Sequence, residues 1–139
     1  NTHKTPLFDD YGHHPVEIDA VFKSLKNTYQ NKRLVVIFQP HRYSRTKDLF
    51  DDFARTLSTA DALILLDIYP ANEKPIAQIS SSTLAEAIRN RSGLDPIVIK
   101  NTQEVLSVLP NIINDSDLLL TLGAGDIHTL PALLKSNYH

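Results

Sequence analysis

The stretch that decides the fold is Arg33-Leu-Val-Val-Ile-Phe-Gln-Pro-His-Arg-Tyr-Ser-Arg-Thr46. Its apolar run, Leu34 to Phe38, is rich in β-branched and aromatic side chains. Such a run predicts a strand that is buried on both faces of a sheet. Pro40 is expected to end the strand, because its nitrogen carries no hydrogen to donate to a neighbouring strand.

The residues after Pro40 carry the first functional signal. We refer to His41, Arg42 and Arg45 as the cationic cluster, and Thr46 is expected to open an amphipathic helix directly after it. Arginines on a surface loop are common, but two guanidiniums beside an imidazole repel one another unless an anion joins them. Arginine holds a carboxylate or a phosphate by two parallel hydrogen bonds. The cluster therefore predicts an anion site between a strand and a helix.

Comparable apolar runs recur along the chain and alternate with helical patterns. The other expected strands are Pro6–Asp9, Ala62–Leu66, Pro96–Ile99 and Asp117–Leu122. Helices are expected to start at Pro15, at Thr83 with a capping box to Glu86, at Asn101 and at Asp126. Because the strands are continuously apolar, the pattern favours an α/β fold with a mostly parallel sheet. We expect a Rossmann-like three-layer sandwich, in which a sheet of about five to six strands carries helices on both faces.

Composition limits the classes of function. The chain has 139 residues, 42% of them hydrophobic, which is enough for the core of one domain. A net charge of −2 leaves no basic face for nucleic acid. No apolar run approaches the roughly 18 residues of a membrane span. The absence of cysteine fits a reducing compartment, so we expect a cytoplasmic protein that contacts neither nucleic acid nor membrane.

The ends of the chain suggest that it is part of something longer. The sequence contains no methionine, so we expect a piece of a larger protein. Residues 1–6 are expected to form a disordered or artificial end, and residues 7–135 a single domain.

Polar residues gather where the expected strands end. In a doubly wound sheet these ends meet at one edge, where ligands bind. The residues in question are Asp9 to His14 after the first strand, the cationic cluster after the second, Asp67, Tyr69 and Glu73 after the third, and Gly123 to Asp126 after the fifth. The opposite edge has ordinary polar linkers such as Asn31-Lys32. A functional site is therefore predicted at the edge where the strands end.

Some of these signals have simpler interpretations. His13-His14 lacks the helical spacing of a zinc pair and is more typical of a capping imidazole with a solvated neighbour, so no metal site is expected. Gly123-Ala-Gly125 lacks the third glycine of a dinucleotide fingerprint and favours a close packing turn. No G-x-x-x-x-G-K-[ST] motif is present, so this chain cannot cradle a nucleoside triphosphate alone.

Four motifs resemble the C-terminal domain of the muramyl (Mur) ligases, and they follow one another in the same order as in that family. They are Asp9-Asp-Tyr-Gly-His-His-Pro15, Phe38-Gln-Pro-His-Arg-Tyr-Ser-Arg-Thr46, Leu66-Asp-Ile-Tyr-Pro-Ala71 with Glu73-Lys-Pro-Ile76, and Leu122-Gly-Ala-Gly-Asp-Ile127. The second motif is the one most similar to the branch that adds L-alanine. Asn72 departs from the family, which more often has glycine there, but asparagine tolerates a left-handed backbone.

The resemblance implies an ATP-dependent carboxylate–amine ligase of peptidoglycan synthesis, with L-alanine, ATP and UDP-N-acetylmuramate as substrates. The lactyl carboxylate would become an acyl phosphate, which the alanine amine attacks. ATP and Mg²⁺ would be held mainly by a central domain that this chain lacks, together with the N-terminal UDP-binding domain. This domain would bind the amino acid, close over ATP and pack against the other two. Alone it is expected to be inactive.

The resemblance also implies roles for individual residues. His41, Arg42 and Arg45 would bind the alanine carboxylate. Tyr11 and His13 would be catalytic, facing the reacting amine or the γ-phosphate. Asp9 and Asp10 would bind the nucleotide, with orientation of His13 as an alternative role for Asp10.

Three alternatives remain open on the sequence. A ligase that recycles murein tripeptide is related, but usually differs in the motif that contains the cationic cluster. A receiver-type phosphoacceptor domain would use Asp9-Asp10 and Asp67, yet it expects a lysine after the last strand, where Gly123 stands. A non-catalytic docking module would leave the cationic cluster without a shared ligand.

Overall fold

The computed structural model describes residues 6–10, 12, 14–123 and 125–138, and within them the chain forms an open sheet of five strands. The strands are β1 (Leu7–Asp10), β2 (Arg33–Phe38), β3 (Ala62–Leu66), β4 (Ile97–Ile99) and β5 (Asp117–Leu122). Their order across the sheet is β1-β5-β2-β3-β4, and each neighbouring pair is parallel. The predicted α/β class with a parallel sheet is confirmed.

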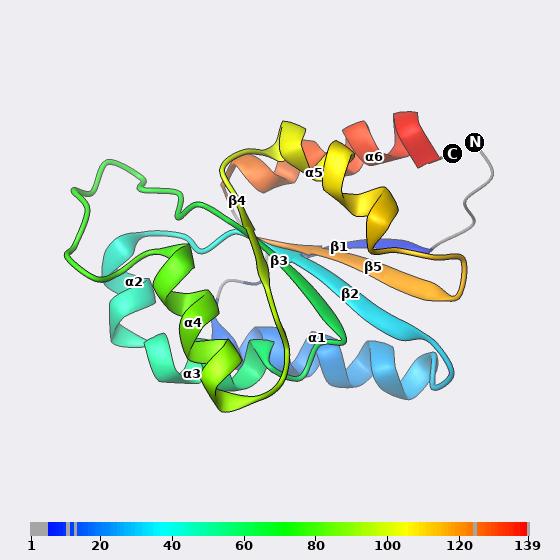
Figure 1. Ribbon diagram of the computed structural model, residues 1–139, viewed down its shortest axis with the longest axis horizontal. Helices are drawn as coiled ribbons and strands as arrows, with labels where there is room; N and C mark the ends of the chain where they lie inside the picture. Colours follow the sequence, from blue (N-terminus) through cyan, green and yellow to red (C-terminus); the bar gives the residue numbers. More distant parts are fainter. Residues whose placement is uncertain (1–5, 11, 13, 124, 139) are drawn as a thin grey trace.

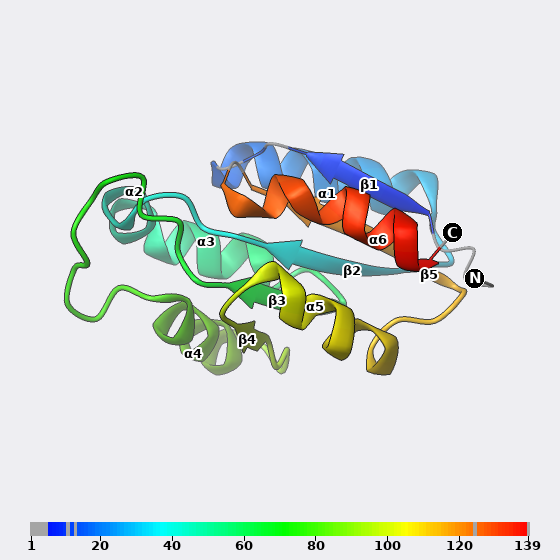
Figure 2. The same ribbon diagram turned by 90° about the horizontal axis from the view of Figure 1, so that it is seen from above.

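Helices cover both faces of the sheet (Figures 1 and 2). The helices are α1 (Pro15–Thr28), α2 (Tyr43–Asp48), α3 (Phe50–Leu57), α4 (Ser81–Arg91), α5 (Thr102–Val108) and α6 (Leu130–Tyr138), with short 3₁₀ turns η1 (Leu109–Asn111) and η2 (Asp126–Thr129). Helices α1, α3 and α4 lie on one face, and α5 and α6 on the other. Helix α6 continues past residue 135, to Tyr138. None of the helices in the described residues is long and apolar enough to span a bilayer.

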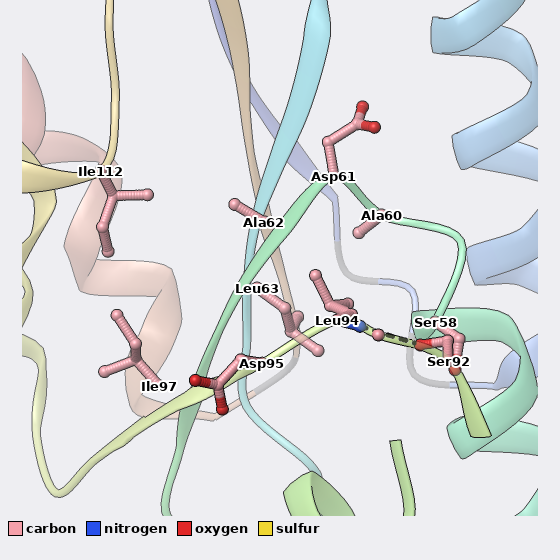
Figure 3. A pocket seen from close by; sticks show the side chains of 11 residues that line it. Ser58, Ala60, Asp61, Ala62, Leu63, Ser92, Leu94, Asp95, Ile97 and Ile112 are labelled. Carbon is pink, nitrogen blue, oxygen red and sulfur yellow. Dashed lines mark hydrogen bonds between the residues drawn. The ribbon is translucent and has the colours of Figure 1, made fainter. Parts of the chain in front are cut away.

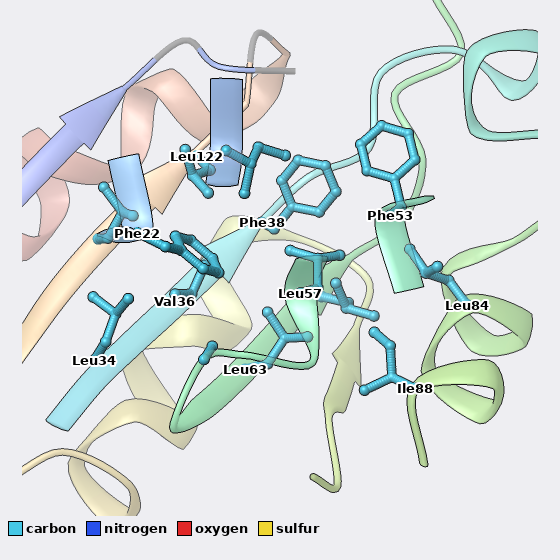
Figure 4. Close-up of a cluster of buried hydrophobic side chains, with 14 of the residues drawn as sticks. Phe22, Leu34, Val36, Phe38, Phe53, Leu57, Leu63, Leu84, Ile88 and Leu122 are labelled. Carbon is cyan, nitrogen blue, oxygen red and sulfur yellow. The ribbon is translucent and has the colours of Figure 1, made fainter. Parts of the chain in front are cut away.

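The core explains why β2 is a continuous apolar run. Leu34, Val36 and Phe38 pack with side chains of α1, α3 and α4, as Figure 4 shows. The intervening Val35 and Ile37 pack on the opposite face, against α5, η2 and α6. All five side chains are fully buried, and burial of each contributes about 1.5–3 kcal/mol. A slip of one residue would exchange the two faces, so this alternation fixes the strand register.

The helix after the cationic cluster differs from the expectation. Thr46 does not open it, because α2 begins at Tyr43 and the helical stretch is divided at Leu49, which ends α2 and begins α3. Thr46 lies inside α2, is 1% exposed, and its hydroxyl donates to the carbonyl of Arg42 at 2.8 Å. A buried threonine within a helix satisfies its hydroxyl on the preceding turn in this way.

The start of α4 was also predicted wrongly. Ser80, and not Thr83, is the N-cap: its hydroxyl oxygen accepts a hydrogen bond from the Thr83 N–H at 3.1 Å. Thr83 completes the capping box by accepting from the Ser80 N–H at 3.0 Å. The expected cap of α5 is confirmed, since Asn101 Oδ1 accepts from the Glu104 N–H at 3.1 Å.

Candidate functional site

The ends of β1, β5 and β2 form one continuous edge, which we call the carboxyl edge. Beyond β5, the Gly123 N–H donates to the carbonyl of Asp10 at 3.1 Å, and the Gln39 N–H donates to the carbonyl of Leu122 at 3.1 Å. The turn after β1 and the cationic cluster after β2 therefore occupy the same edge, with the end of β5 between them.

Main-chain hydrogen bonds hold the cationic cluster against the end of β3. Tyr69 donates its N–H to the carbonyl of Pro40 at 2.8 Å and accepts from the Arg42 N–H at 2.7 Å. The imidazole of His41 stacks on the ring of Tyr69, with ring centroids 5.4 Å apart and planes inclined by 15°. The cluster is thus an ordered extension of the β2–β3 pair.

Arg42 adopts a backbone conformation that is unusual for a residue with a side chain. Its φ of 74° and ψ of 140° lie in a region that costs on the order of 1–3 kcal/mol outside glycine. The hydrogen bond to Tyr69 and two donors of Thr46, its N–H at 3.2 Å and its hydroxyl at 2.8 Å, hold Arg42 in place. A strained backbone conformation that several hydrogen bonds hold in place is typical of binding sites.

The positive charge of the cluster is only partly compensated. Arg45, in α2, places Nη1 3.5 Å from Nδ1 of His41 and has no carboxylate partner among the residues described. The Arg42 guanidinium is 3.9 Å from the Glu73 carboxylate, which is the long limit of an ion pair, and its side chain is 47% exposed. This arrangement can accept a further anion.

Glu73 lies in the long connection between β3 and α4, beside α2 (Figure 1). Its carboxylate accepts from the Ser44 N–H at 3.0 Å and from the Ser44 hydroxyl at 2.5 Å. The hydroxyl bond, followed by the main-chain bond, holds the pKa of the Glu73 carboxyl below its ordinary value. Asn72, the departure from the family, has a φ of 72°, so asparagine adopts the left-handed turn here.

Gln39, a residue at the carboxyl edge, was not singled out from the sequence, whereas Gly125 was interpreted there as part of a packing turn. Gln39 is 4% exposed; its Oε1 accepts from the Ile127 N–H at 2.9 Å, and its Nε2 donates to the Asp67 carbonyl at 3.2 Å. Gly125 packs directly on Tyr69: a Cβ there would lie 2.6 Å from Tyr69 Cγ. The glycine turn is therefore a close packing turn, as predicted. A polar side chain beside Pro40, at the end of a buried strand, was the available signal for Gln39.

The candidate residues after β1 are only partly described. Asp9 Oδ1 accepts from the Thr121 hydroxyl at 2.6 Å, and Asp10 Oδ1 accepts from the Gly12 N–H at 2.7 Å. His14 caps α1, since its Nδ1 accepts from the Val16 N–H at 3.1 Å, which confirms the capping imidazole. Tyr11 and His13 lie outside the described residues.

A pocket of about 630 Å³ opens at the opposite edge, near the starts of β3 and β4 (Figure 3). Its two carboxylates are already engaged: Asp61 Oδ2 accepts from the Leu34 N–H at 2.7 Å, and Asp95 Oδ1 accepts from Arg89 Nε at 2.5 Å. Asp61 fixes the main chain near the start of β2, whereas the exposed pair of Asp95 with Arg89 contributes little to stability. Across the residues whose placement is described, no three His, Asp or Glu side chains gather as a metal site would require.

An open α/β sheet with an anion-accepting carboxyl edge defines the structural class, and sequence comparison gives the family. A family model described as the Mur ligase, glutamate ligase domain, matches residues 1–125. The chain belongs to the Mur ligase C-terminal domain family. This confirms the resemblance seen in the four motifs.

Similar proteins extend the comparison. The chain is 75% identical over 138 residues to a UDP-N-acetylmuramate–L-alanine ligase of Vesicomyosocius okutanii, covering 99% of this chain and 29% of that protein. It is 55% identical over 124 residues to the ligase of the same name from Stenotrophomonas maltophilia, covering 89% of this chain and 26% of that protein. The chain thus spans less than a third of these relatives.

A solved structure supports the fold independently. A murein peptide ligase from Psychrobacter arcticus superimposes with a TM-score of 0.69 at 20% identity, over 94% of this chain and 27% of that one. At this level of identity the likeness concerns the fold alone.

Proposed function

We propose that the chain is the amino-acid-binding domain of an ATP-dependent ligase that joins L-alanine to UDP-N-acetylmuramate in peptidoglycan synthesis. The names of the relatives that are 75% and 55% identical support this substrate pair. The cytoplasm, where ATP is available, is the proposed location.

The observation that carries the proposal is the partly compensated cationic cluster on the carboxyl edge. Arg42 and Arg45 bind the alanine carboxylate, with His41 beside them, because guanidinium and carboxylate form short charge-assisted hydrogen bonds. Binding through the carboxylate directs the amine away from the two guanidiniums. The amine is then presented to the acyl group that it attacks, and a well-oriented nucleophile reacts faster for entropic reasons.

The residues after β1 complete the proposed site from the same edge. Tyr11 and His13 act on the reacting amine or the γ-phosphate, and Asp9 and Asp10 contact the nucleotide. Next to Tyr11 in the sequence, the Gly12 N–H donates to Asp10 Oδ1 at 2.7 Å. The cationic cluster also suits the charge that develops when amine attack forms the carbon–nitrogen bond and phosphate departs.

ATP and Mg²⁺ are assigned mainly to the central domain of the full-length enzyme. This chain has no phosphate-binding glycine-rich motif, although its positive edge fits an anionic ligand. When bound, ATP supplies the phosphoryl group that activates the carboxylate, and Mg²⁺ neutralises its charge. We propose that the domain closes over the nucleotide and packs against its own central and N-terminal domains.

The test is kinetic, in the full-length ligase that contains this chain. Arg42→Ala and Arg45→Ala should each raise the KM for L-alanine at least tenfold, since a lost charge-assisted hydrogen bond is worth about 2 kcal/mol. Arg42→Lys should recover only part of the loss, because lysine cannot bind a carboxylate bidentately.

The control is Arg55→Ala, which removes an exposed arginine that pairs with Asp52 on α3. It should leave the KM for L-alanine unchanged. A change of less than threefold in that KM for both cluster variants would contradict the assignment.

A further inference from the structure

The carboxyl edge contains a built-in negative charge beside the Arg42 guanidinium. Arg42 and Arg45 contribute two positive charges, and Glu73, 3.9 Å from Arg42, contributes one negative charge. Like an ordinary glutamate, Glu73 is ionised at neutral pH. Excluding the imidazole of His41, these three side chains together carry one net positive charge, which one carboxylate neutralises.

Glu73 is held in position by contacts that do not involve the proposed ligand. Both hydrogen bonds from Ser44, at 3.0 and 2.5 Å, end on its two carboxylate oxygens. Its side chain is 24% exposed, less than the 47% of Arg42. A carboxylate anchored in this way stays beside the Arg42 guanidinium when a ligand arrives.

We propose that Glu73 is a specificity-determining residue, whose fixed carboxylate makes the carboxyl edge accept amino acids with an uncharged side chain and reject those with a second carboxylate. This inference rests on the proposed function, because it takes the cationic cluster as the seat of the amino acid. The discrimination arises from a repulsive element built against the wrong ligand.

The expected size of the effect follows from Coulomb's law. Two carboxylates about 6 Å apart, at an effective dielectric constant of about 40, disfavour each other by roughly a factor of ten in binding. Salt weakens this repulsion, because the edge is partly exposed to solvent.

Glu73→Gln separates the charge from the hydrogen bonds. The glutamine Oε1 can still accept from the Ser44 N–H, and its amide can donate to the Ser44 hydroxyl. The variant therefore keeps the attachment of the connection to α2 and removes the negative charge.

The experiment measures L-aspartate and its neutral isostere L-asparagine as competitive inhibitors against L-alanine in the full-length ligase that contains this chain. Because the two differ by a charge at nearly equal size, the ratio of their Ki values isolates electrostatic rejection from steric fit. In Glu73→Gln the ratio of Ki for aspartate to Ki for asparagine should fall about tenfold, and the KM for L-alanine should stay within threefold of wild type. Glu73→Asp, which keeps the charge, should retain the wild-type ratio.

Glu86→Gln is the matched control, since it neutralises an exposed glutamate on α4 and should leave the ratio unchanged. An unchanged ratio in Glu73→Gln overturns the inference, and so does an absence of inhibition by aspartate in that variant. If the enzyme still uses L-alanine saturably, the proposed function stands in either case. If wild-type enzyme shows no saturable use of L-alanine, the proposed function fails and the inference fails with it.

Discussion

Gly125 shows how one missing side chain shapes the carboxyl edge. A Cβ at this position would lie 2.6 Å from Tyr69 Cγ and 2.8 Å from Gln39 Oε1. Gly125→Ala should therefore displace Tyr69 from its stack on His41 and destabilise the fold by about 1–3 kcal/mol. Urea unfolding should report the loss of stability, and the KM for L-alanine should rise with it in the full-length enzyme.

Gly93→Ala provides the comparison, because a Cβ there would meet nothing within 4 Å. Its effect on the free energy of unfolding should stay within about 0.5 kcal/mol. Equal losses in the two variants would show that close packing at Gly125 is not the cause.

At this scale the charged candidate residues were easier to recognise in the sequence than the neutral ones. His41, Arg42 and Arg45 are recognisable because like charges crowd together within one loop. The importance of Gln39 rests on a contact with Ile127, 88 residues away, which no local pattern encodes. The anchoring of Glu73 likewise depends on Ser44, 29 residues earlier in the chain.

At the scale of single elements, the start of α4 offers a direct test of its cap. Ser80→Ala removes the hydroxyl oxygen that accepts from the Thr83 N–H, and should lower the free energy of unfolding by about 1 kcal/mol. Thermal and urea unfolding of both proteins measure the difference.

Ser82→Ala is the matched substitution in the same turn, at an exposed serine. It should change stability by less than about 0.5 kcal/mol. If Ser82→Ala lowered the free energy of unfolding more than Ser80→Ala, the helix start predicted at Thr83 would be favoured instead.

The ranges of β3 and β5 were easier to predict than the starts of α2 and α4, for a physical reason. Strands β3 and β5 coincide with their predicted ranges, because continuous burial on two faces leaves an uninterrupted apolar run. The start of α4 depends instead on a tertiary contact. The buried Ser81 donates its hydroxyl to the carbonyl of Leu66, at the end of β3, and this bond places the first helical turn ahead of Thr83.

At the scale of the whole molecule, one ion pair joins segments that are distant in sequence. Asp117, which is fully buried, accepts from Arg33 Nε and Nη2 at 3.0 Å each, and from the Asn114 N–H at 3.0 Å. It connects β5 with β2 at the edge opposite the site. Asp117→Asn should lower the free energy of unfolding by about 1.5–3 kcal/mol, measured in urea, and leave the KM for L-alanine unchanged.

Asp52→Asn is the control for that variant, since it breaks an exposed pair with Arg55 within α3. Such a pair contributes at most about 1 kcal/mol. A large rise in KM for Asp117→Asn would mean that the two edges of the sheet are coupled.

The fold class and the gathering of the candidate residues at one edge were predictable at this scale, because continuously apolar strands imply a parallel sheet, and a parallel sheet brings its strand ends together. The expectation did not include the position of β5 between β1 and β2. That order depends on how the two faces of each strand are covered, which involves every helix at once.

The main-chain bonds between Pro40, Arg42 and Tyr69 have an evolutionary consequence. Amide and carbonyl groups are common to nearly all amino acids, so these two main-chain bonds do not themselves require particular side chains at residues 40, 42 and 69. Related enzymes can therefore change their substrate preference by exchanging a few side chains at this corner, while the main-chain hydrogen bonds stay the same. In such a family, substrate selectivity can change without a change in the main-chain structure of this corner.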